Sequence, residues 1–400
     1  MSSPVPLPVD VQPIDSRPSA PAQLRTLSFA RGLWRIASAG ASAGNRVALL
    51  RDGGQAFEAM LGAIAEARDS VVLECYLVTA DAVGNRFADA LVAAAARGVR
   101  VRMVADWVGS RGAGRAYWKR LRDADVHVRM FNPPGARPWL GMLPRDHRKV
   151  LVADDVVGIT GGFGLSEAWS GGMRRRRTAP WRDTAVRIEG PAAVDMSRAF
   201  QLMWRRANFE RRPKRWRRRQ LVRPARGANT DPQTSQGAVV GIVEGEPWRL
   251  RVARALQWQA ASAEKFIWIA SAYFYPAAPE LEALAGAAQD GVDVRLLVPS
   301  KYDHPWVRRL TRRVYHRLLR NGVRIWEWNG AMMHAKTSVV DGHWVRVGST
   351  DFNPLGIAIN YELDAIIEDS ALGEDAVEMY LADLASSTEI RWRGRAGTNR

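Results

Sequence analysis

The sequence predicts an α/β protein made of two similar halves, each a sandwich of helices against a sheet. Three observations lead to this fold class. Apolar, β-rich runs alternate with Ala-rich amphipathic segments along most of the 400 residues. The same series of runs occurs twice, in the same order. Each series ends in a strand-like run that carries a His, a Lys two residues later and an Asp five residues after the Lys.

The repeated runs can be paired one by one along the chain. A helical segment ends at a Gly before several of these runs, and a buried strand follows. The pairs are DSVVLECYLV (69–78) with EKFIWIASAYF (264–274), ARGVRVRMVAD (96–106) with QDGVDVRLLVPS (289–300), and ADVHVRMFN (124–132) with NGVRIWEWN (321–329). Each half is therefore predicted to run strand, helix, strand, helix, strand, and then the strand with the triplet.

The two triplets are the candidate catalytic residues. A chain of this composition in random order would hold roughly 0.005 such triplets, so two copies indicate shared chemistry. On a strand, residues two apart point to the same face, so each His–Lys pair presents a nucleophile beside a cation. The Asp lies beyond the strand, and we interpret its role as fixing a turn. The triplets are His147, Lys149 and Asp154, and His334, Lys336 and Asp341.

These residue types fit phosphodiester chemistry without a metal. The transition state spreads negative charge over the non-bridging oxygens, and Lys149 and Lys336 can stabilise that charge. One imidazole can attack phosphorus while the other protonates the leaving alcohol. No cluster of His, Asp and Glu has the spacing of a metal site, so we expect no metal and no other cofactor.

The doubled triplet resembles the phospholipase D superfamily, whose members join two His-x-Lys-x4-Asp motifs across a pseudo-twofold axis into one active site. The resemblance extends from about Gly44 to Asp383. Four stretches are more narrowly similar to the bacterial cardiolipin synthase branch: GNRVALLRDGGQAFEAML, GGFGLSEAW, WRDTAVRIEGPAA and NPLGIAINYELDAIIED. The resemblance implies a phosphatidyltransferase that acts on phosphatidylglycerol through a phosphohistidine and releases glycerol or another headgroup alcohol. It also implies peripheral association with the cytoplasmic side of a bacterial inner membrane.

The resemblance further assigns a carboxylate to each histidine. In the superfamily an acidic residue downstream of each motif holds the histidine of the opposite half and fixes its tautomer. This assigns Glu362 to His147 and Asp183 to His334. We take His147 as the nucleophile and His334 as the acid and base, although the pseudo-symmetry leaves the reverse assignment open.

The segments after the triplets depart from the superfamily pattern. An Asn that usually meets phosphate oxygens is replaced by Gly164 in the first copy and by Asp351 in the second. Ser349 and Gly162 are the residues that we expect to contact the substrate phosphate. Asp351 is excluded from the predicted site, because an ionised carboxylate beside a phosphate would be repelled unless it pointed away or paired with an Arg.

Composition divides the chain into five segments and indicates an anionic partner. We predict a disordered tail over 1–43, halves over 44–204 and 238–385, a basic linker over 205–237, and a basic tail over 386–400. The Arg-rich part of the linker, Arg211 to Gln220, is a candidate for contact with a membrane or another polyanion. Cys75 is the one cysteine, which excludes an intramolecular disulfide.

Other functions remain open at this point. A phospholipase that uses water as acceptor, or a nuclease, would use the same motifs, although single-motif nucleases must dimerise and this chain holds both copies. A non-catalytic polyanion-binding protein would account for the net charge of +17 but not for the doubled His–Lys pairs. We therefore expect an anionic phospholipid substrate and no obligate nucleic-acid partner. The oligomeric state is not determined by the sequence.

Overall fold

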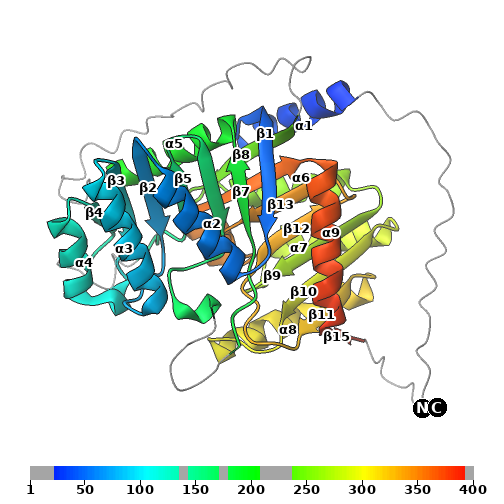
Figure 1. Cartoon of the computed structure of the whole chain (residues 1–400). Coiled ribbons are helices and arrows are strands. Elements are labelled where there is room, and N and C mark those ends of the chain that lie inside the picture. The colour runs from blue at the N-terminus through cyan, green and yellow to red at the C-terminus, as the bar shows by residue number, and fades with distance from the viewer. Residues whose placement is uncertain (1–21, 135–142, 171–178, 208–236, 392–400) are drawn as a thin grey trace, which may run out of the picture.

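The structure, a computed structural model, describes residues 22–134, 143–170, 179–207 and 237–391 (Figure 1). The amino-terminal helix α1 spans Ala22–Ala37. The elements of the first half are β1 Ala41–Leu50, α2 Gly53–Glu66, β2 Ser70–Cys75, α3 Ala82–Ala96, β3 Arg100–Asp106, η1 Arg111–Ala113, α4 Gly114–Asp123, β4 His127–Phe131, β5 Lys149–Ala153, β6 Val157–Gly161, η2 Glu167–Trp169, β7 Ala185–Glu189 and α5 Pro191–Arg206.

The second half repeats this order. Its elements are β8 Ala238–Gly245, α6 Arg251–Ser262, β9 Phe266–Ser271, α7 Ala278–Gln289, β10 Asp293–Pro299, α8 Pro305–Arg320, β11 Arg324–Trp328, β12 Lys336–Val340, β13 Trp344–Gly348, η5 Leu355–Ile359, β14 Glu362–Glu368, α9 Ser370–Ala385 and β15 Ser387–Ile390. The predicted fold class, two α/β halves that alternate strand and helix before the triplet strand, is confirmed. Figure 1 shows the first half, blue to green, beside the second half, yellow to red.

One sheet runs through both halves. Its strand order among the described residues is β15-β11-β10-β9-β12-β13-β14-β8-β1-β7-β6-β5-β2-β3-β4. Apart from β15, the order on one side of the β8–β1 pair mirrors the order on the other, with β14 matching β7 and β12 matching β5. The antiparallel pairing of Ala41 with Gly241 and of Ser42 with Val240 joins the halves at the centre. A pseudo-twofold axis therefore passes between β1 and β8.

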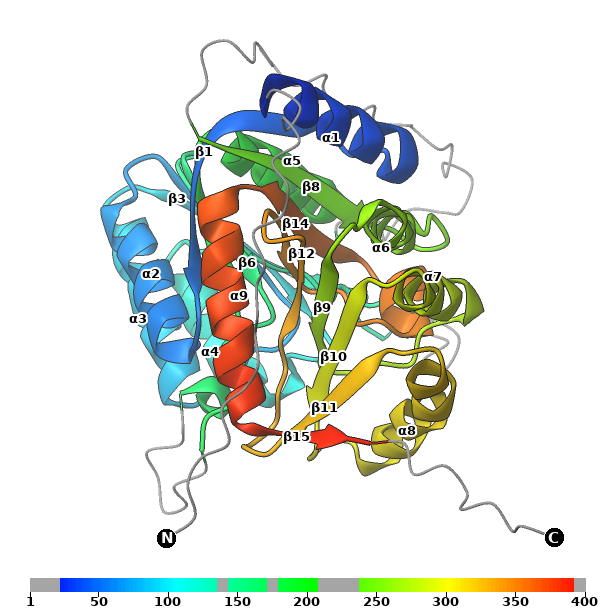
Figure 2. The same ribbon diagram turned by 90° about the vertical axis from the view of Figure 1, so that its right-hand side faces the viewer.

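Helices cover the sheet on both faces, and one core is shared. Helices α2, α3 and α4 bury Phe57, Phe87 and Leu121 against the first half, and α7 and α8 bury Leu284 and Leu318 against the second half. Helices α5 and α9 contribute to a core cluster that contains residues of both halves. Figure 2 shows α9 in front of the sheet, with α7 and α8 on the other side of β10.

Local sequence signals explain where the helices begin and end. Asp52, Asp81 and Asp369 precede α2, α3 and α9, and each side chain accepts a hydrogen bond from a backbone N–H in the first turn. After α3 and α7, Gly98 and Gly291 take left-handed φ values of 87° and 94°, which end the helix and lead into a buried strand. These are the helix-to-strand glycines predicted from the sequence.

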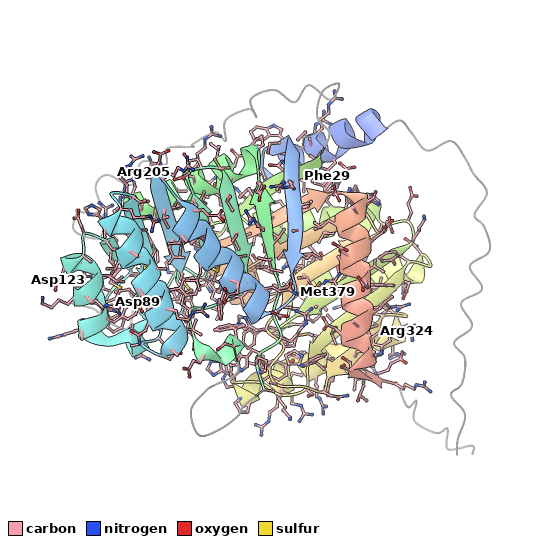
Figure 3. The ribbon with its side chains drawn as sticks, viewed as in Figure 1. Phe29, Asp89, Asp123, Arg205, Arg324 and Met379 are labelled. Atoms are coloured by element: carbon pink, nitrogen blue, oxygen red, sulfur yellow. The ribbon has the colours of Figure 1, made fainter. Side chains whose placement is uncertain are left out.

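Both segments that we assigned to tails contain regular structure. Residues 22–37 form α1, which buries Phe29 and Leu33 against β1, β8 and α6 (Figure 3). Phe29 lies 5.6 Å from the ring of Trp258, so apolar burial orders a segment that we assigned to the tail. At the other end, β15 pairs with β11 in antiparallel register. Residues 1–21, 392–400 and most of the predicted linker, 208–236, lie outside the described residues.

Candidate active site

Backbone hydrogen bonds between the halves position both histidines. Each triplet strand begins at its lysine, so His147 precedes β5 and His334 precedes β12 by two residues. His147 N donates to Tyr361 O at 2.9 Å, and His334 N donates to Arg182 O at 2.6 Å. Tyr361 and Arg182 occupy the segments that lead into β14 and β7, so each histidine is attached to the opposite half. The two motifs therefore meet at the pseudo-twofold axis.

Each histidine also contacts a buried carboxylate of the opposite half. His147 Nδ1 lies 3.0 Å from Glu362 Oε1, and His334 Nδ1 lies 2.8 Å from Asp183 Oδ2. The structure thus brings together the two pairs expected from the sequence. Because Nδ1 donates to the carboxylate, Nε2 of each ring is left for chemistry at phosphorus.

Ser349 and Gly162 contact the carboxylates that orient the histidines. Ser349 Oγ donates to Glu362 Oε2 at 2.5 Å and accepts from Leu363 N at 3.0 Å, and its side chain is buried. At Gly162, a Cβ atom would lie 2.2 Å from Asp183 Oδ1, so the carboxyl group occupies the space that a side chain would need. The contact of both residues with a substrate phosphate stays a prediction.

Gly164 likewise makes room for a neighbouring side chain. A Cβ atom at Gly164 would lie 2.8 Å from the ring of Trp169. Trp169 Nε1 donates to Asp183 Oδ2 at 2.9 Å, and this bond holds the carboxylate that contacts His334. The sequence offered no signal for this role of Trp169, because the contact depends on how the loop after β6 folds back.

The lysines place two cations at the site. Lys149 Nζ donates to His147 O at 2.6 Å, and Lys336 Nζ donates to His334 O at 2.7 Å. Lys336 Nζ also lies 3.3 Å from Asp351 Oδ1. Asp351 therefore belongs to the site after all, and its ion pair with Lys336 removes the repulsion on which we based its exclusion.

Burial shifts the protonation of these groups. It lowers the pKa of His147 and of His334 well below the usual value, and the nearby lysines lower both further. Burial also lowers the pKa of Lys149 to about 8 and raises that of Glu362 to about 8 and that of Asp183 to about 6. Both imidazoles are therefore neutral at neutral pH before an anion binds.

The third member of each triplet lies away from the histidines. Asp154 follows β5 at the end opposite Lys149, and its carboxylate accepts hydrogen bonds from the backbone N–H groups of residues 68, 69 and 70. Asp341 accepts the corresponding bonds from residues 264, 265 and 266. Both take left-handed φ values, 53° and 52°. Both therefore fix a turn, as we interpreted them, and their inclusion among the catalytic candidates is wrong.

We expect Asp154→Asn to lower the free energy of unfolding by about 2 kcal/mol, since an amide nitrogen would face a backbone N–H. The kcat should stay close to that of the wild type. Although burial alone would raise the pKa of Asp154, hydrogen bonds from Ser70, Arg68 and Asp69 lower it. The stabilisation is therefore present above pH ~4 and lost as the pH falls through the folded-state value.

Urea titrations of both proteins at several pH values measure this difference, and Asp155→Asn, in the same turn, is the control. The two unfolding curves should converge below pH ~4. A loss of kcat with unchanged stability would return Asp154 to the catalytic set.

Aromatic rings enclose the histidines unequally. Tyr76, just after β2, packs edge-on against His147 with ring centroids 4.9 Å apart. Tyr273, just after β9, packs edge-on against His334 at 6.1 Å. Trp169 and Trp181 also pack on His334, at 5.4 and 5.7 Å. These rings had no predicted role in the site, although Tyr76 and Tyr273 both lie within the paired strand-like runs 69–78 and 264–274.

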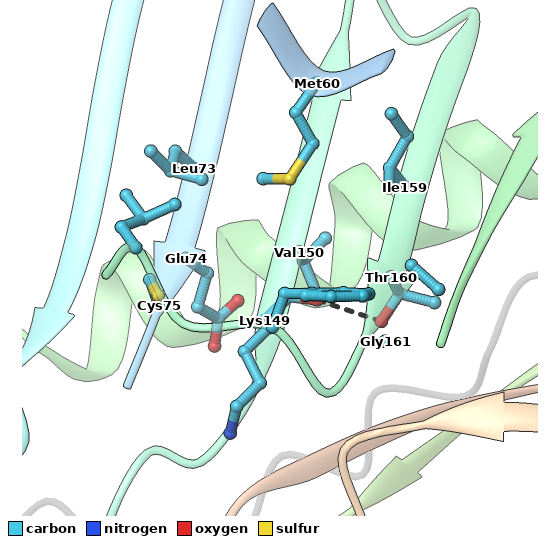
Figure 4. Close-up of a pocket in the computed structure, with 12 residues that line it drawn as sticks. Met60, Leu73, Glu74, Cys75, Lys149, Val150, Ile159, Thr160 and Gly161 are labelled. Atoms are coloured by element: carbon cyan, nitrogen blue, oxygen red, sulfur yellow. Dashed lines mark hydrogen bonds between the residues drawn. The ribbon is translucent and has the colours of Figure 1, made fainter. Parts of the chain in front are cut away.

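A small pocket lined in part by Lys149 is too small for a substrate. Its volume is about 10 Å³, which is room for about one water molecule. Figure 4 shows that the Lys149 amine points away from this cavity, while Thr160 Oγ1 donates to Lys149 O at 2.9 Å. This space is therefore a gap in the packing around β5 and is not a ligand site. Among the described residues, no group of three or more His, Cys, Asp and Glu has the arrangement of a metal site.

The arrangement fits transfer of a phosphoryl-centred group. Each of the two imidazoles is oriented by a carboxylate at Nδ1, and two lysines supply positive charge for non-bridging oxygens. Nε2 of His334 lies 3.2 Å from Lys336 Nζ.

The chain is similar to known proteins over most of its length. A family described as "Cardiolipin synthase, PLD-like domain" matches residues 60–204 and 257–384. The major cardiolipin synthase of Bacillus subtilis is 30% identical over 87% of this chain and 70% of its own length. Cardiolipin synthase A of Pseudomonas aeruginosa is 31% identical over 92% of this chain and 73% of its own length.

Solved structures share the fold at lower sequence identity. The phosphatidylserine synthase of Haemophilus influenzae aligns with a TM-score of 0.69 and 14% identity, over 90% of this chain and 91% of that protein. The polyphosphate kinase of Porphyromonas gingivalis aligns with a TM-score of 0.57 and 14% identity, over 87% of this chain and 48% of that one. These likenesses support the two-half architecture.

Proposed function

Because the chain belongs to the cardiolipin synthase branch of the phospholipase D superfamily, we propose that it is a phosphatidyltransferase that makes cardiolipin. It transfers a phosphatidyl group to phosphatidylglycerol and releases glycerol or another headgroup alcohol. The observation that carries the proposal is the exchange of carboxylates, in which Glu362 and Asp183 each orient the histidine of the other half. Two imidazoles fixed on one axis can perform in-line displacement at a single phosphorus.

In the first step, His147 Nε2 attacks the phosphorus of the donor, and the bond from phosphorus to the headgroup oxygen breaks. His334 gives its proton to that oxygen, and the bound phosphate favours the protonated imidazole by its negative charge. Lys149 and Lys336 stabilise the non-bridging oxygens. In the second step, His334 takes the proton of a phosphatidylglycerol hydroxyl, whose oxygen displaces His147 from phosphorus.

A contact of Lys336 supports His147 as the nucleophile. Lys336 Nζ lies 3.2 Å from both ring nitrogens of His334, so that ring already contacts a cation. Both amines lie over a tyrosine, Lys149 Nζ 5.4 Å from the centroid of Tyr76 and Lys336 Nζ 5.8 Å from that of Tyr273. Among the described residues, Lys149 makes no such contact with the ring nitrogens of His147. His147 Nε2 is thus the freer of the two nitrogens for attack.

The experiment that tests the function incubates the purified protein with vesicles of labelled phosphatidylglycerol and identifies the products by mass. Cardiolipin and glycerol are the expected products, and their formation should persist in EDTA, because the lysines supply the positive charge. Phosphatidic acid alone would identify a phospholipase, and cleavage of added DNA without lipid turnover would identify a nuclease.

We also propose the surface through which the protein contacts the membrane. No helix in the described ranges has both the length and the apolar character to span a bilayer. Trp248 is 77% exposed, and Leu250 and Leu355 lie on neighbouring elements with 39% and 46% exposure. Trp248 N donates to Ala358 O at 2.7 Å, which fixes the loop against η5. We call Trp248, Leu250 and Leu355 the Trp248 surface.

The backbone conformation and the nearby charges support a binding role for the Trp248 surface. Trp248 and Leu250 take left-handed φ values of 65° and 51°, which cost free energy in bulky residues. Arg206, Arg249 and Arg251 share the single carboxylate of Glu246, so the loop carries excess positive charge. An indole with leucines and arginines fits an anionic lipid interface. The predicted Arg211 to Gln220 contact lies outside the described residues.

We expect Trp248→Ser to weaken binding to anionic vesicles by about tenfold, because the indole loses its burial in the interface. Turnover of a soluble short-chain substrate should stay unchanged. Cosedimentation with phosphatidylglycerol vesicles measures the binding, and Trp34→Ser, at another exposed indole, is the matched control. Equal vesicle binding by Trp248→Ser and the wild type would exclude this surface.

A further inference from the structure

The pseudo-twofold axis relates two tyrosines that differ in their charged neighbours. Tyr76 and Tyr273 each follow the first parallel strand of their half and pack on the histidine of that half. Arg145 and Arg111 are charged groups near Tyr76, together with Asp106. Tyr273 instead donates its hydroxyl to Asp303 Oδ1 at 2.6 Å. Near Tyr76 the carboxylate of Asp106 forms an ion pair with Arg145 at 2.9 Å, whereas among the described residues no lysine or arginine pairs with Asp303. The His334 side of the site therefore carries the less compensated carboxylate.

Asp303 is unusual in a chain with a net charge of +17. Throughout the described part of the chain, no lysine or arginine forms an ion pair with it, and His304 Nε2, at 3.8 Å, is a charged partner only when the imidazole is protonated. The Tyr273 hydroxyl and His304 N both donate to Oδ1 and hold the group in place. The side chain is 27% exposed. Oδ2 can therefore accept a hydrogen bond from a molecule in the site.

Resting on the proposed function, we propose that Tyr273 and Asp303 form a subsite for the headgroup alcohol, which donates a hydroxyl or ammonium hydrogen bond to Asp303. In proton transfer the alcohol oxygen lies about 3 Å from His334. The headgroup then extends along the ring of Tyr273, which spans the distance from His334 to Asp303. The phosphate, by contrast, lies between the lysines.

This subsite would select the alcohol by its second polar group. Glycerol offers a further hydroxyl and ethanolamine offers an ammonium, and both donate to a carboxylate. An alcohol without such a group, such as 1-propanol, would leave Asp303 without that hydrogen bond and lose the corresponding affinity. The same subsite receives the incoming alcohol, because the second step reverses the geometry of the first. Asp303 is thus a specificity residue, and Tyr273 positions it.

The test measures how the phosphatidyl group partitions between an added alcohol and water. A soluble short-chain phosphatidylglycerol is the donor, and isotopically labelled glycerol, ethanolamine and 1-propanol are compared as acceptors at equal concentration. Transfer to glycerol is then measured by the label that enters phosphatidylglycerol. The wild type should transfer to glycerol, ethanolamine or both in preference to 1-propanol. Asp303→Leu should reduce that preference by about tenfold or more, the value of a hydrogen bond to a charged group. Asp290→Asn, an exposed Asp at the end of α7, should leave it unchanged.

The ratio of the product formed with each alcohol to the product formed with water reports specificity. A misfolded or slowed enzyme forms less of every product and leaves this ratio unchanged. Asp303→Asn keeps an acceptor oxygen but removes the negative charge. Its preference for glycerol over 1-propanol should therefore fall less than its preference for ethanolamine over 1-propanol. A preference for glycerol alone identifies a polyol subsite, and one for ethanolamine alone identifies an ammonium subsite. An unchanged preference in Asp303→Leu, or none in the wild type, overturns the inference. No transfer to any acceptor, including water, would instead contradict the proposed function.

Discussion

His147→Ala is expected to lower kcat by about 10⁴-fold or more and to form no phosphohistidine, because the substitution removes the nucleophile. His334→Asn should also lower turnover of phosphatidylglycerol strongly, since the leaving alcohol then receives no proton. With a nitrophenyl phosphodiester, whose leaving group needs little protonation, His334→Asn should still accumulate label on His147. The two substitutions therefore have different consequences although the histidines are related by pseudo-symmetry.

Acid quenching with labelled substrate, followed by mapping of the labelled peptide, distinguishes the roles. We expect label on the peptide that contains His147 in the wild type and in His334→Asn. Label on the peptide that contains His334 would reverse the assignment. Turnover without covalent label on either peptide would reject the two-step mechanism. Substitution of the exposed His127 by Ala controls for general effects of removing an imidazole.

The dependence of kcat/KM on pH is expected to be bell-shaped, with both limbs near pH 8. Burial raises the pKa of Glu362 to about 8, so below this pH its pair with His147 holds an extra proton and Nε2 cannot attack. Burial lowers the pKa of Lys149 to about 8, so above this pH the positive charge on that lysine is lost. The rate therefore rises towards pH 8 and falls beyond it, and kcat/KM reports these groups in the free enzyme.

Glu362→Gln should lower kcat/KM by about 100-fold or more, because the imidazole of His147 loses the carboxylate that fixes its tautomer. The acid limb should also move to lower pH, since only the imidazole of His147, whose pKa is lowered by burial, then titrates. Rate profiles from pH 5 to 10 measure both effects, with Glu374→Gln, at an exposed glutamate of α9, as control. An acid limb that stays in place would assign it to another group.

The sequence was sufficient for features that depend on local pattern or on the doubled motif. Apolar runs and glycines after helices determine local backbone geometry, so the alternation of strands and helices followed directly. The spacing of His147 and Lys149 on one strand, and its repetition, located the site. The pairing of Glu362 with His147 came from the family resemblance, because no local pattern connects residues 215 positions apart.

Features that depend on packing between distant segments were not predictable in this way. The contact of Ser349 with Glu362 was not predicted, since a sequence does not show that a neighbouring strand places the carboxylate within reach of the hydroxyl. Asp351 was excluded because a carboxylate repels an anion, and the sequence does not show that the loop after β13 brings Asp351 within 3.3 Å of Lys336. Helix α1 was missed because Phe29 is buried by residues of both halves, which composition does not indicate.

The exchange of carboxylates between the halves also bears on how activity arises during folding. A half that has folded alone holds a histidine without its carboxylate and a carboxylate without its histidine. Docking supplies both contacts together with the backbone bonds at His147 and His334, and a small displacement of one half lengthens all of them at once. Activity therefore depends on correct docking of the two halves. In a nascent or partly unfolded chain the nucleophile lacks the carboxylate that orients it, so it attacks the phosphodiesters around it slowly.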